Sequence, residues 1–284
     1  MKIGILHPGE MGAAIAASAC NSGMDVYWCS EGRSAATLER ANSLGLNALP
    51  SLQSLCDTCD LLISVCPPHA ALELAELVMA CNFQGIYADV NAVSPTTVTT
   101  IASKLEKAGI EVVDGGIIGL PPVTRGTTWL YLSGKAAAKV MDCFDAGPLE
   151  TEVLSDRIGE ASGLKICFAA NSKGTAALHT AILAAADNMG VRDALENQWD
   201  IFNPGFTAKS HGRIRQVARK SWRFIGEMKE IASTLESNGL PREFFDAAAE
   251  IYERQITFKD VEQEPAIEAI LETVKASMKI SYQD

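Results

Sequence analysis

Residues 3–12 read IGILHPGEMG, and the small residues AAIAASA follow directly. The apolar start predicts a short buried strand, the glycines a turn, and the small residues a helix. This order is typical of a dinucleotide pyrophosphate site, because N–H groups and the dipole at a helix N-terminus favour negative charge. Gly9 would let the backbone approach the phosphates, and Gly12 would let helix and strand pack closely. His7 replaces the first glycine of the usual G-x-G-x-x-G, so the motif is incomplete.

Composition limits the function classes. The chain has 284 residues, 48% of them hydrophobic, and a formal net charge of −11. This length predicts two domains, because single domains typically reach roughly 200 residues at most. Nucleic acid and anionic membrane surfaces need a basic footprint, and no apolar run approaches the roughly 20 residues that span a bilayer. We therefore expect a cytoplasmic protein with a small-molecule substrate, no nucleic-acid or membrane partner and no metal site.

Strands and helices alternate in the first half of the chain. The predicted strands cover residues 2–6, 25–29, 61–65, 86–90, 111–114 and 128–133, and the predicted helices cover 11–22, 35–44, 69–79, 95–108 and 135–145. This alternation is typical of a parallel sheet with helices on both faces. We predict an α/β fold, with an N-terminal Rossmann-type doubly wound parallel sheet (residues 1–157) followed by an all-helical C-terminal domain (residues 158–284).

The second half of the chain predicts helices only. Residues 159–189 contain no proline and are rich in alanine, which predicts one long helix. Further helices are predicted at 212–238, 242–256 and 265–277. A basic stretch consists of Lys209, Arg213, Arg215, Arg219, Lys220 and Arg223. It would neutralise a bound anion, pair with a second subunit, or form a solvated helix face.

The loop after the second strand bears on the choice of cofactor. It reads CSEGRS at positions 29–34, in which Arg33 and Ser34 suit a 2′-phosphate. Glu31 suits an unphosphorylated ribose instead. We expect NADP(H) as the preferred cofactor, with NAD(H) as the alternative. The predicted cofactor contacts in the first loop are His7, Pro8, Gly9, Glu10, Met11 and Gly12.

Two later strand ends predict further contacts. Cys66, Pro67 and Pro68 follow the strand DLLISV, and the prolines predict a rigid loop near the nicotinamide ring. Asn91 lies at the end of another strand, with its amide expected to be free for cofactor or substrate. Residues 114–122, DGGIIGLPP, predict a backbone-lined loop against a small ligand.

Lys165 is the predicted catalytic residue. It lies near the start of the long helix, in GEASGLKICFAAN, where small and apolar neighbours would partly desolvate an ammonium group used for proton transfer. Ser172 falls on the same face of a regular helix. The alternative is a lysine whose stem covers apolar surface while its head reaches water.

Four of these segments, in this order, resemble motifs of the β-hydroxyacid dehydrogenase superfamily, which includes 6-phosphogluconate and 3-hydroxyisobutyrate dehydrogenases. IGILHPGEMG resembles its phosphate-binding motif, ADVNAVSP its D-x-S-T-x-x-P segment, VDGGIIGLPP its substrate loop, and GEASGLKICFAAN its catalytic-lysine helix. The carboxyl half resembles a poorly characterised phosphogluconate-dehydrogenase-like branch. The resemblance implies that Lys165 is the general acid/base and that the helical domain forms a homodimer. It also implies substrate contacts by Asn91, Ile118, Gly119 and Ser172.

The chain departs from this family at three places, one of which is the asparagine expected about one turn after the lysine, where this chain has Phe168 and Ala169. Asn91 and Ala92 replace the usual serine and threonine, and Ile118 replaces a serine that helps hold a substrate carboxylate. Imine reductases share the scaffold and have a more apolar substrate loop, but they generally lack a lysine at the position of Lys165. We predict an NADP-dependent oxidoreductase that transfers a hydride between nicotinamide and a small hydroxy or carbonyl substrate. The alternatives are an imine reductase or reductive aminase, and a non-catalytic NADP-binding sensor.

Overall fold

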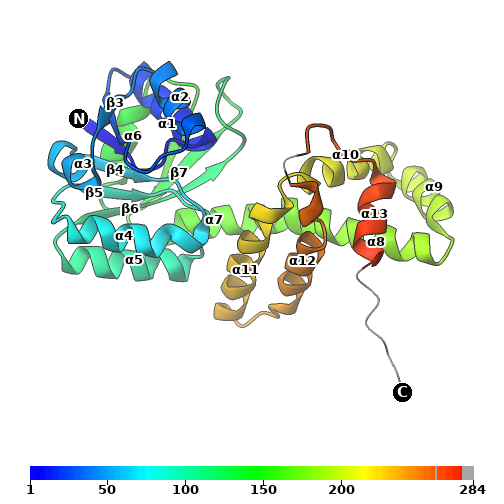
Figure 1. Cartoon of the computed structure of the whole chain (residues 1–284). Helices are drawn as coiled ribbons and strands as arrows, with labels where there is room; N and C mark the ends of the chain where they lie inside the picture. The colour runs from blue at the N-terminus through cyan, green and yellow to red at the C-terminus, as the bar shows by residue number, and fades with distance from the viewer. Residues whose placement is uncertain (260, 277–284) are drawn as a thin grey trace. The chain divides into compact units, whose positions relative to one another are not determined.

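The structure is a computed structural model that describes residues 1–259 and 261–276. The chain divides into two compact units, Met1–Ile166 and Cys167–Asp284. The first unit contains a sheet covered by helices, and the described part of the second unit is helical (Figure 1). The predicted fold class, a Rossmann-type sheet followed by helices, is therefore confirmed.

An eight-stranded sheet forms the centre of the first unit, in the order β3-β2-β1-β4-β5-β6-β7-β8. The strands are β1 (Lys2–Ile5), β2 (Asp25–Cys29), β3 (Asn47–Leu49), β4 (Leu61–Ser64), β5 (Ile86–Asp89), β6 (Glu111–Ile118), β7 (Trp129–Ser133) and β8 (Glu150–Ser155). All neighbours from β3 to β6 are parallel, whereas β7 runs antiparallel to β6 and β8 runs parallel to β7. The strand order reverses between β1 and β4, which is where such sheets bind ligands beyond their carboxyl ends.

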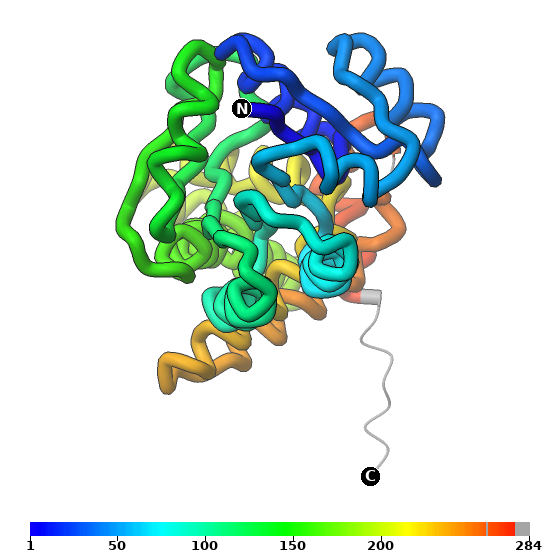
Figure 2. Tube along the Cα trace, turned by 90° about the vertical axis from the view of Figure 1, so that its left-hand side faces the viewer, coloured from blue at the N-terminus to red at the C-terminus, as the bar shows by residue number. Residues whose placement is uncertain are grey.

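Helices cover both faces of this sheet. They are α1 (Glu10–Asn21), α2 (Ala35–Ser43), α3 (Leu52–Thr58), α4 (Ala71–Ala80), α5 (Pro95–Lys107) and α6 (Ala137–Met141). Helices α1, α2 and α6 share one apolar core with the sheet, around the fully buried Trp28. Helices α3, α4 and α5 share the other, around Tyr87, and Figure 2 shows α4 and α5 side by side and end-on. The central strands β4 and β5 are buried on both faces, as expected for a parallel sheet, whereas the edge strands β3 and β8 are not.

Three features of the sheet differ from prediction. The edge strands β3 and β8 were not predicted, because β3 has only three residues and β8 is polar, ETEVLS. Residues 114–118 are not a loop but the end of β6. A Cβ on Gly115 would lie 2.5 Å from Val90 Cγ1, and one on Gly116 would lie 2.4 Å from the Ala161 carbonyl oxygen. The two glycines therefore allow close packing of a buried strand.

The long predicted helix is present but not regular. It consists of α7 (Glu160–Ala169), a π-helical turn (Ala170–Gly174) and α8 (Thr175–Asn188). A π turn rotates less per residue than an α-helix. Ser172 lies within this turn, so the regular-helix projection that placed it on the Lys165 face does not hold.

The remaining helices belong to the second unit. They are α9 (Arg192–Phe202), α10 (Phe206–Ala218), α11 (Ser221–Ser237), α12 (Glu243–Glu253) and α13 (Ile267–Ala276). The single helix predicted at 212–238 is wrong, because α10 and α11 are separate elements. The buried Ser221 hydroxyl donates to the Gln255 carbonyl at 3.1 Å, which fixes the start of α11. The predicted end of the last helix, residue 277, lies outside the described residues.

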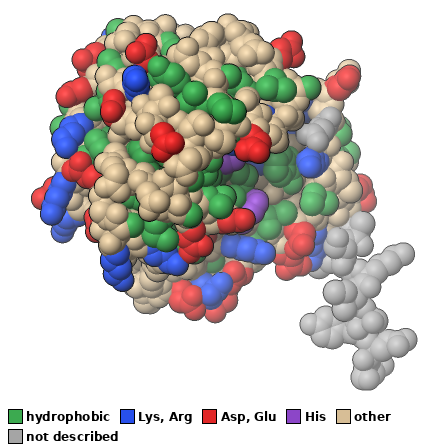
Figure 3. Space-filling view, turned by 60° about the vertical axis from the view of Figure 1, so that its left-hand side comes forward, with side chains coloured by type: hydrophobic (Ala, Val, Ile, Leu, Met, Phe, Trp, Pro, Cys, Tyr) green, Lys and Arg blue, Asp and Glu red, His purple; other side chains and the backbone are tan. Residues whose placement is uncertain are grey.

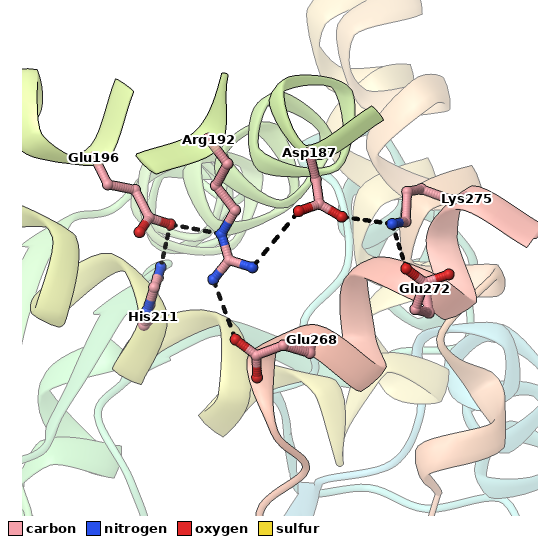
Figure 4. A network of polar contacts seen from close by, with 7 residues as sticks. All are labelled: Asp187, Arg192, Glu196, His211, Glu268, Glu272 and Lys275. Carbon is pink, nitrogen blue, oxygen red and sulfur yellow. Dashed lines mark hydrogen bonds and ion pairs between the residues drawn. The ribbon is translucent and has the colours of Figure 1, made fainter. Parts of the chain in front are cut away.

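Ion pairs connect four helices of the second unit (Figure 4). Arg192 on α9 contacts Glu196 at 2.8 Å and Glu268 on α13 at 3.3 Å. His211 on α10 contacts the same Glu196 oxygen at 2.9 Å, and Lys275 contacts Asp187 on α8 at 2.5 Å. These contacts hold the helix ends together.

The charged and apolar side chains on the surface show where the predicted basic stretch finds its partners. Arg215 of that stretch contacts Glu264 at 3.6 Å and the Pro265 carbonyl at 3.0 Å, so it pairs within its own unit. On the face drawn in Figure 3, acidic, basic and apolar side chains are intermixed. Within residues 1–259 and 261–276, no helix has the length and apolar character of a membrane span.

Candidate functional site

The turn between β1 and α1 has the geometry of an anion site. Gly9 is the N-cap of α1 and adopts an extended backbone conformation (φ −68°, ψ −168°), and as a glycine it has no side chain to cap the helix. A Cβ on Gly9 would meet no atom within 4 Å, whereas a Cβ on Gly12 would lie 2.1 Å from the His7 carbonyl oxygen. Gly12 therefore permits close packing of α1 on the turn, and Gly9 leaves the first helical turn open to a ligand. Pro8, Glu10 and Met11 complete this segment.

His7 is an uncharged member of this turn. Burial, and then the nearby Arg33 guanidinium, lower its pKa to about 4, so the imidazole is neutral at pH 7. The His7 carbonyl accepts the Gly9 N–H at 2.9 Å. Its Nδ1 is buried and has no hydrogen-bond partner among the described residues. His7 therefore shapes the turn without adding positive charge.

Two arginines supply the positive charge at this turn. Arg33 donates from Nη2 to the Leu6 carbonyl at 2.9 Å and from Nε to the Cys29 carbonyl at 3.2 Å. Arg40 on α2 donates from Nη1 to the Pro8 carbonyl at 3.2 Å. The backbone bonds hold both guanidinium groups at the ends of β1 and β2 and leave other N–H groups of each fork for a phosphate.

Arg40 was missed by sequence analysis. It lies on α2, the helix that begins at Ala35 directly after the Arg33 loop, and a second arginine so soon after Arg33 was the available signal. The predicted Ser34 caps α2, because its hydroxyl accepts the Thr37 N–H at 3.3 Å. Glu31 is exposed in the same loop.

Asn91 does not have the free amide that the sequence predicts. It is 3% exposed. Its Oδ1 accepts the Cys66 N–H at 2.5 Å, and its Nδ2 donates to the Ser64 hydroxyl at 2.9 Å. Asn91 is therefore engaged with the end of β4, and the predicted Pro67 and Pro68 follow the residue it contacts.

Asp89 is a buried carboxyl group beside this contact. Its Oδ1 accepts the Asn91 N–H at 3.1 Å, and its Oδ2 has no hydrogen-bond partner among the described residues. Burial raises the pKa of Asp89 from 3.8 to about 7; Asn91 hydrogen bonds lower it and the Asp114 charge raises it. Asp89 therefore loses its proton near pH 7 instead of near pH 4.

Replacing Asp89 with asparagine is expected to change how stability depends on pH. The folded-state pKa lies above the unfolded value, so the native state binds the extra proton, and this stabilisation is lost as pH rises through about 7. Between pH 5 and pH 7.5 the wild type should lose about 2–3 kcal/mol of unfolding free energy relative to Asp89→Asn. Urea unfolding of both proteins at the two pH values measures this. A constant difference, or one that favours the wild type at higher pH, would contradict the assignment.

Lys165 lies at the carboxyl edge of the sheet. It is half-buried on α7, and its Nζ donates to the Ile117 carbonyl at 2.6 Å. Strand β6 pairs with β5 up to Asp114 and continues to Ile118, so this carbonyl lies beyond the end of β5. The ammonium group is thus on the same edge as the turn after β1 and the loop after β4.

Asp114 fixes the start of the helix that carries Lys165. Its Oδ2 accepts N–H groups from Gly159 at 2.9 Å and Ser162 at 3.0 Å, and its Oδ1 accepts the Ser162 hydroxyl at 2.5 Å. The Ser133 hydroxyl donates to the same carboxyl group. Burial raises the pKa of Asp114, and these donors oppose the shift. This residue caps α7 from the neighbouring strand, a role that sequence analysis missed.

Of the predicted substrate residues, Ile118 and Gly119 belong to the first unit and Ser172 belongs to the second. Ile118 ends β6, half-buried. Gly119 follows with φ +130°, and a Cβ there would lie 2.6 Å from the Thr127 carbonyl oxygen, so glycine is required by the turn. Ser172 belongs to the second unit, where its hydroxyl lies 3.5 Å from the Ala169 carbonyl oxygen. No three His, Cys, Asp or Glu side chains gather as metal ligands within the described residues.

Comparison with known proteins gives one family match in each of the two units. Residues 2–146 match the family described as the NAD binding domain of 6-phosphogluconate dehydrogenase. Residues 186–255 match a domain of unknown function. An uncharacterized 28.5 kDa protein of Methanothermus fervidus is 30% identical over 195 residues, which are 69% of this chain and 74% of that protein.

Solved structures share the fold. A conserved protein of unknown function, described as structurally similar to 3-hydroxyacid dehydrogenases, is 26% identical with a TM-score of 0.68, over 91% of this chain and 98% of that one. A 3-hydroxyisobutyrate dehydrogenase from Salmonella typhimurium is 17% identical with a TM-score of 0.67, over 96% and 99%. An imine reductase from Myxococcus stipitatus, in complex with NADP+, is 18% identical with a TM-score of 0.57, over 95% and 98%.

The match to the NAD binding domain spans more than half of the chain. It covers the open turn after β1 and the strands that form the carboxyl edge. The chain therefore belongs to the 6-phosphogluconate dehydrogenase NAD-binding family, and with it to the β-hydroxyacid dehydrogenase superfamily of NAD(P)-dependent dehydrogenases and reductases.

Proposed function

We propose that this chain is an NADP(H)-dependent dehydrogenase or reductase of small hydroxy or carbonyl compounds, with Lys165 as the general acid/base. The observation that carries the proposal is the Lys165 ammonium at the carboxyl edge of the sheet, 2.6 Å from the Ile117 carbonyl oxygen. The edge on which this side chain is held is also the dinucleotide edge of the family.

The residues present fit a phosphorylated dinucleotide. The open space at Gly9 and the first turn of α1 would hold the pyrophosphate. Arg33 and Arg40 would contact the 2′-phosphate, since their guanidinium forks match phosphate oxygens. Bound NADP(H) would supply or accept a hydride at its nicotinamide ring.

Lys165 would handle the proton that accompanies hydride transfer. During reduction its ammonium would donate a proton to the carbonyl oxygen, and during oxidation the neutral amine would accept the hydroxyl proton. The Ile117 carbonyl would orient the group by accepting one of its three N–H bonds. Ile118 and Gly119, which follow directly, would border the substrate at this edge.

An imine substrate is the second candidate. The first residues after β6, GLPPV at positions 119–123, are apolar, with Leu120 62% exposed and Val123 86% exposed, which suits a substrate without a carboxylate. The likeness to an imine reductase is consistent with this choice. A panel of hydroxy acids, carbonyl compounds and cyclic imines, assayed with NADPH and NADP+, would rank the classes, and binding without turnover across the panel would favour a sensor.

We also propose a homodimer formed through the second unit. A groove of about 650 Å³ between α8 and α12 is lined by apolar side chains together with Glu243, Glu250 and Arg254. Phe244 is 75% exposed and Leu178 57% exposed along it, and a second copy of the chain would cover these side chains. Sedimentation of the full chain tests this proposal.

The cofactor assignment is tested by titration. Calorimetry of the wild type is expected to give a Kd for NADPH at least about tenfold lower than for NADH, since each charge-assisted phosphate contact contributes about 1.5–3 kcal/mol. Arg33→Ala and Arg40→Ala should each reduce this preference about tenfold. A variant that merely distorts the turn should weaken NADPH and NADH binding equally, so the ratio of the two Kd values reports the 2′-phosphate contact alone. The exposed Arg125→Ala is the matched control, and tighter NADH binding by the wild type would contradict the NADP assignment.

A further inference from the structure

The loop after β4 is joined to β5 by a side chain rather than by backbone. The backbone ladder between the two strands ends where the Val90 N–H donates to the Ser64 carbonyl at 3.0 Å. Beyond that point, the Asn91 carboxamide accepts from the Cys66 N–H and donates to the Ser64 hydroxyl. Asn91 therefore extends the connection between the strands past the end of the sheet.

The hydrogen bond from Cys66 to Asn91 determines the direction of Pro67 and Pro68, which follow Cys66. Pro67 and Pro68 have no N–H groups, and their φ angles are fixed by their rings. Cys66 thus provides the last backbone donor before a stiff segment, and the direction of that segment depends on how Cys66 is held. The backbone at Asn91 is itself held in place, because the Asn91 backbone N–H donates to Asp89 Oδ1 at 3.1 Å.

The segment lies at the point where the strand order reverses. The Leu6 N–H donates to the Ile63 carbonyl at 3.1 Å, which places the turn between β1 and α1 beside the end of β4. This turn and residues 66–68 therefore follow neighbouring strand ends at the same edge of the sheet. Because Arg33 and Arg40 lie on the β2 side, a dinucleotide that spans this edge has its nicotinamide half on the β4 side.

We infer that Asn91 is a positioning residue for the nicotinamide half of the cofactor, acting through residues 66–68 rather than by touching substrate. The inference rests on the proposed function. Asn91 is 3% exposed, and both ends of its carboxamide are engaged within the protein, so its effect on a ligand is transmitted by the loop that it holds.

Two ligands separate this role from a general loss of structure. NADPH contains both halves of the cofactor, whereas 2′,5′-ADP contains only the adenosine half. Asn91→Ala removes the two neutral hydrogen bonds of the carboxamide. It is expected to raise the Kd for NADPH about tenfold and to leave the Kd for 2′,5′-ADP within about twofold. Asn47→Ala is the matched control, because its side chain bonds the Val26 carbonyl at the far edge of the sheet, and this variant should change neither value.

A second variant keeps the test decisive if Asn91→Ala does not fold. Ser64→Ala removes one of the two partners of the carboxamide and changes the buried volume little. It is expected to raise the Kd for NADPH about threefold without changing that for 2′,5′-ADP. Equal effects on the two ligands, or no effect in either folded variant, would overturn the inference. Failure of the wild type to bind NADPH would instead refute the proposed function.

Discussion

Replacement of Lys165 with methionine is expected to lower kcat by about 10²–10⁴-fold, the usual contribution of a positioned acid or base. Methionine has a similar length and apolar stem but no proton to donate. Initial rates of NADPH oxidation with the best carbonyl substrate of the panel measure the loss. The Kd for NADPH should stay within about threefold of the wild type, because the phosphate contacts proposed for this chain involve other residues.

Lys139→Met is the matched control for this variant. Lys139 lies in the same unit, 60% exposed, and pairs at the surface with Glu111 at 3.1 Å. Its kcat should equal that of the wild type, since surface ion pairs contribute little. If Lys165→Met kept more than half of the wild-type kcat on the preferred substrate, the proton-transfer role would be refuted and Lys165 would be a lysine that only covers apolar surface.

The parts of the fold that could be predicted are those encoded by local patterns. Each of the six predicted strands is present, because each contains a short run of apolar residues in the sequence. The turn at Gly9 and Gly12 was likewise visible as a glycine pattern between a strand and a helix. The missed strand β8 is polar along much of its length, so no such run marks it.

The parts that could not be predicted depend on contacts between distant residues. Asp114 caps a helix whose first residues lie more than forty positions later, and in sequence it only introduces a glycine-rich stretch. Arg40 donates to the carbonyl of Pro8, 32 positions earlier, in the turn between β1 and α1. The Asn91 amide was expected to face a ligand because nothing local reveals that Cys66, 25 positions before it, would take up that group. Pair contacts of this kind follow from topology, which a local pattern does not specify.

Replacement of Gly9 with alanine is expected to remove most NADPH binding while leaving the fold intact. Alanine adopts the observed φ of −68° and ψ of −168° without strain, and its Cβ would meet no protein atom within 4 Å. The added methyl group would instead occupy the space in which a pyrophosphate approaches the first turn of α1. The Kd for NADPH should rise by about 100-fold, and the unfolding free energy should change by less than about 1 kcal/mol.

Gly212→Ala provides the matched control, because Gly212 is exposed on α10 of the second unit and its added Cβ also meets nothing within 4 Å. The most direct measurement is calorimetric titration of the wild type, Gly9→Ala and Gly212→Ala with NADPH under one set of conditions. We predict saturable binding by the wild type and by Gly212→Ala, and binding weakened about 100-fold in a folded Gly9→Ala protein. Equal affinity of all three proteins, or no binding by the wild type, would contradict a dinucleotide site at the turn between β1 and α1.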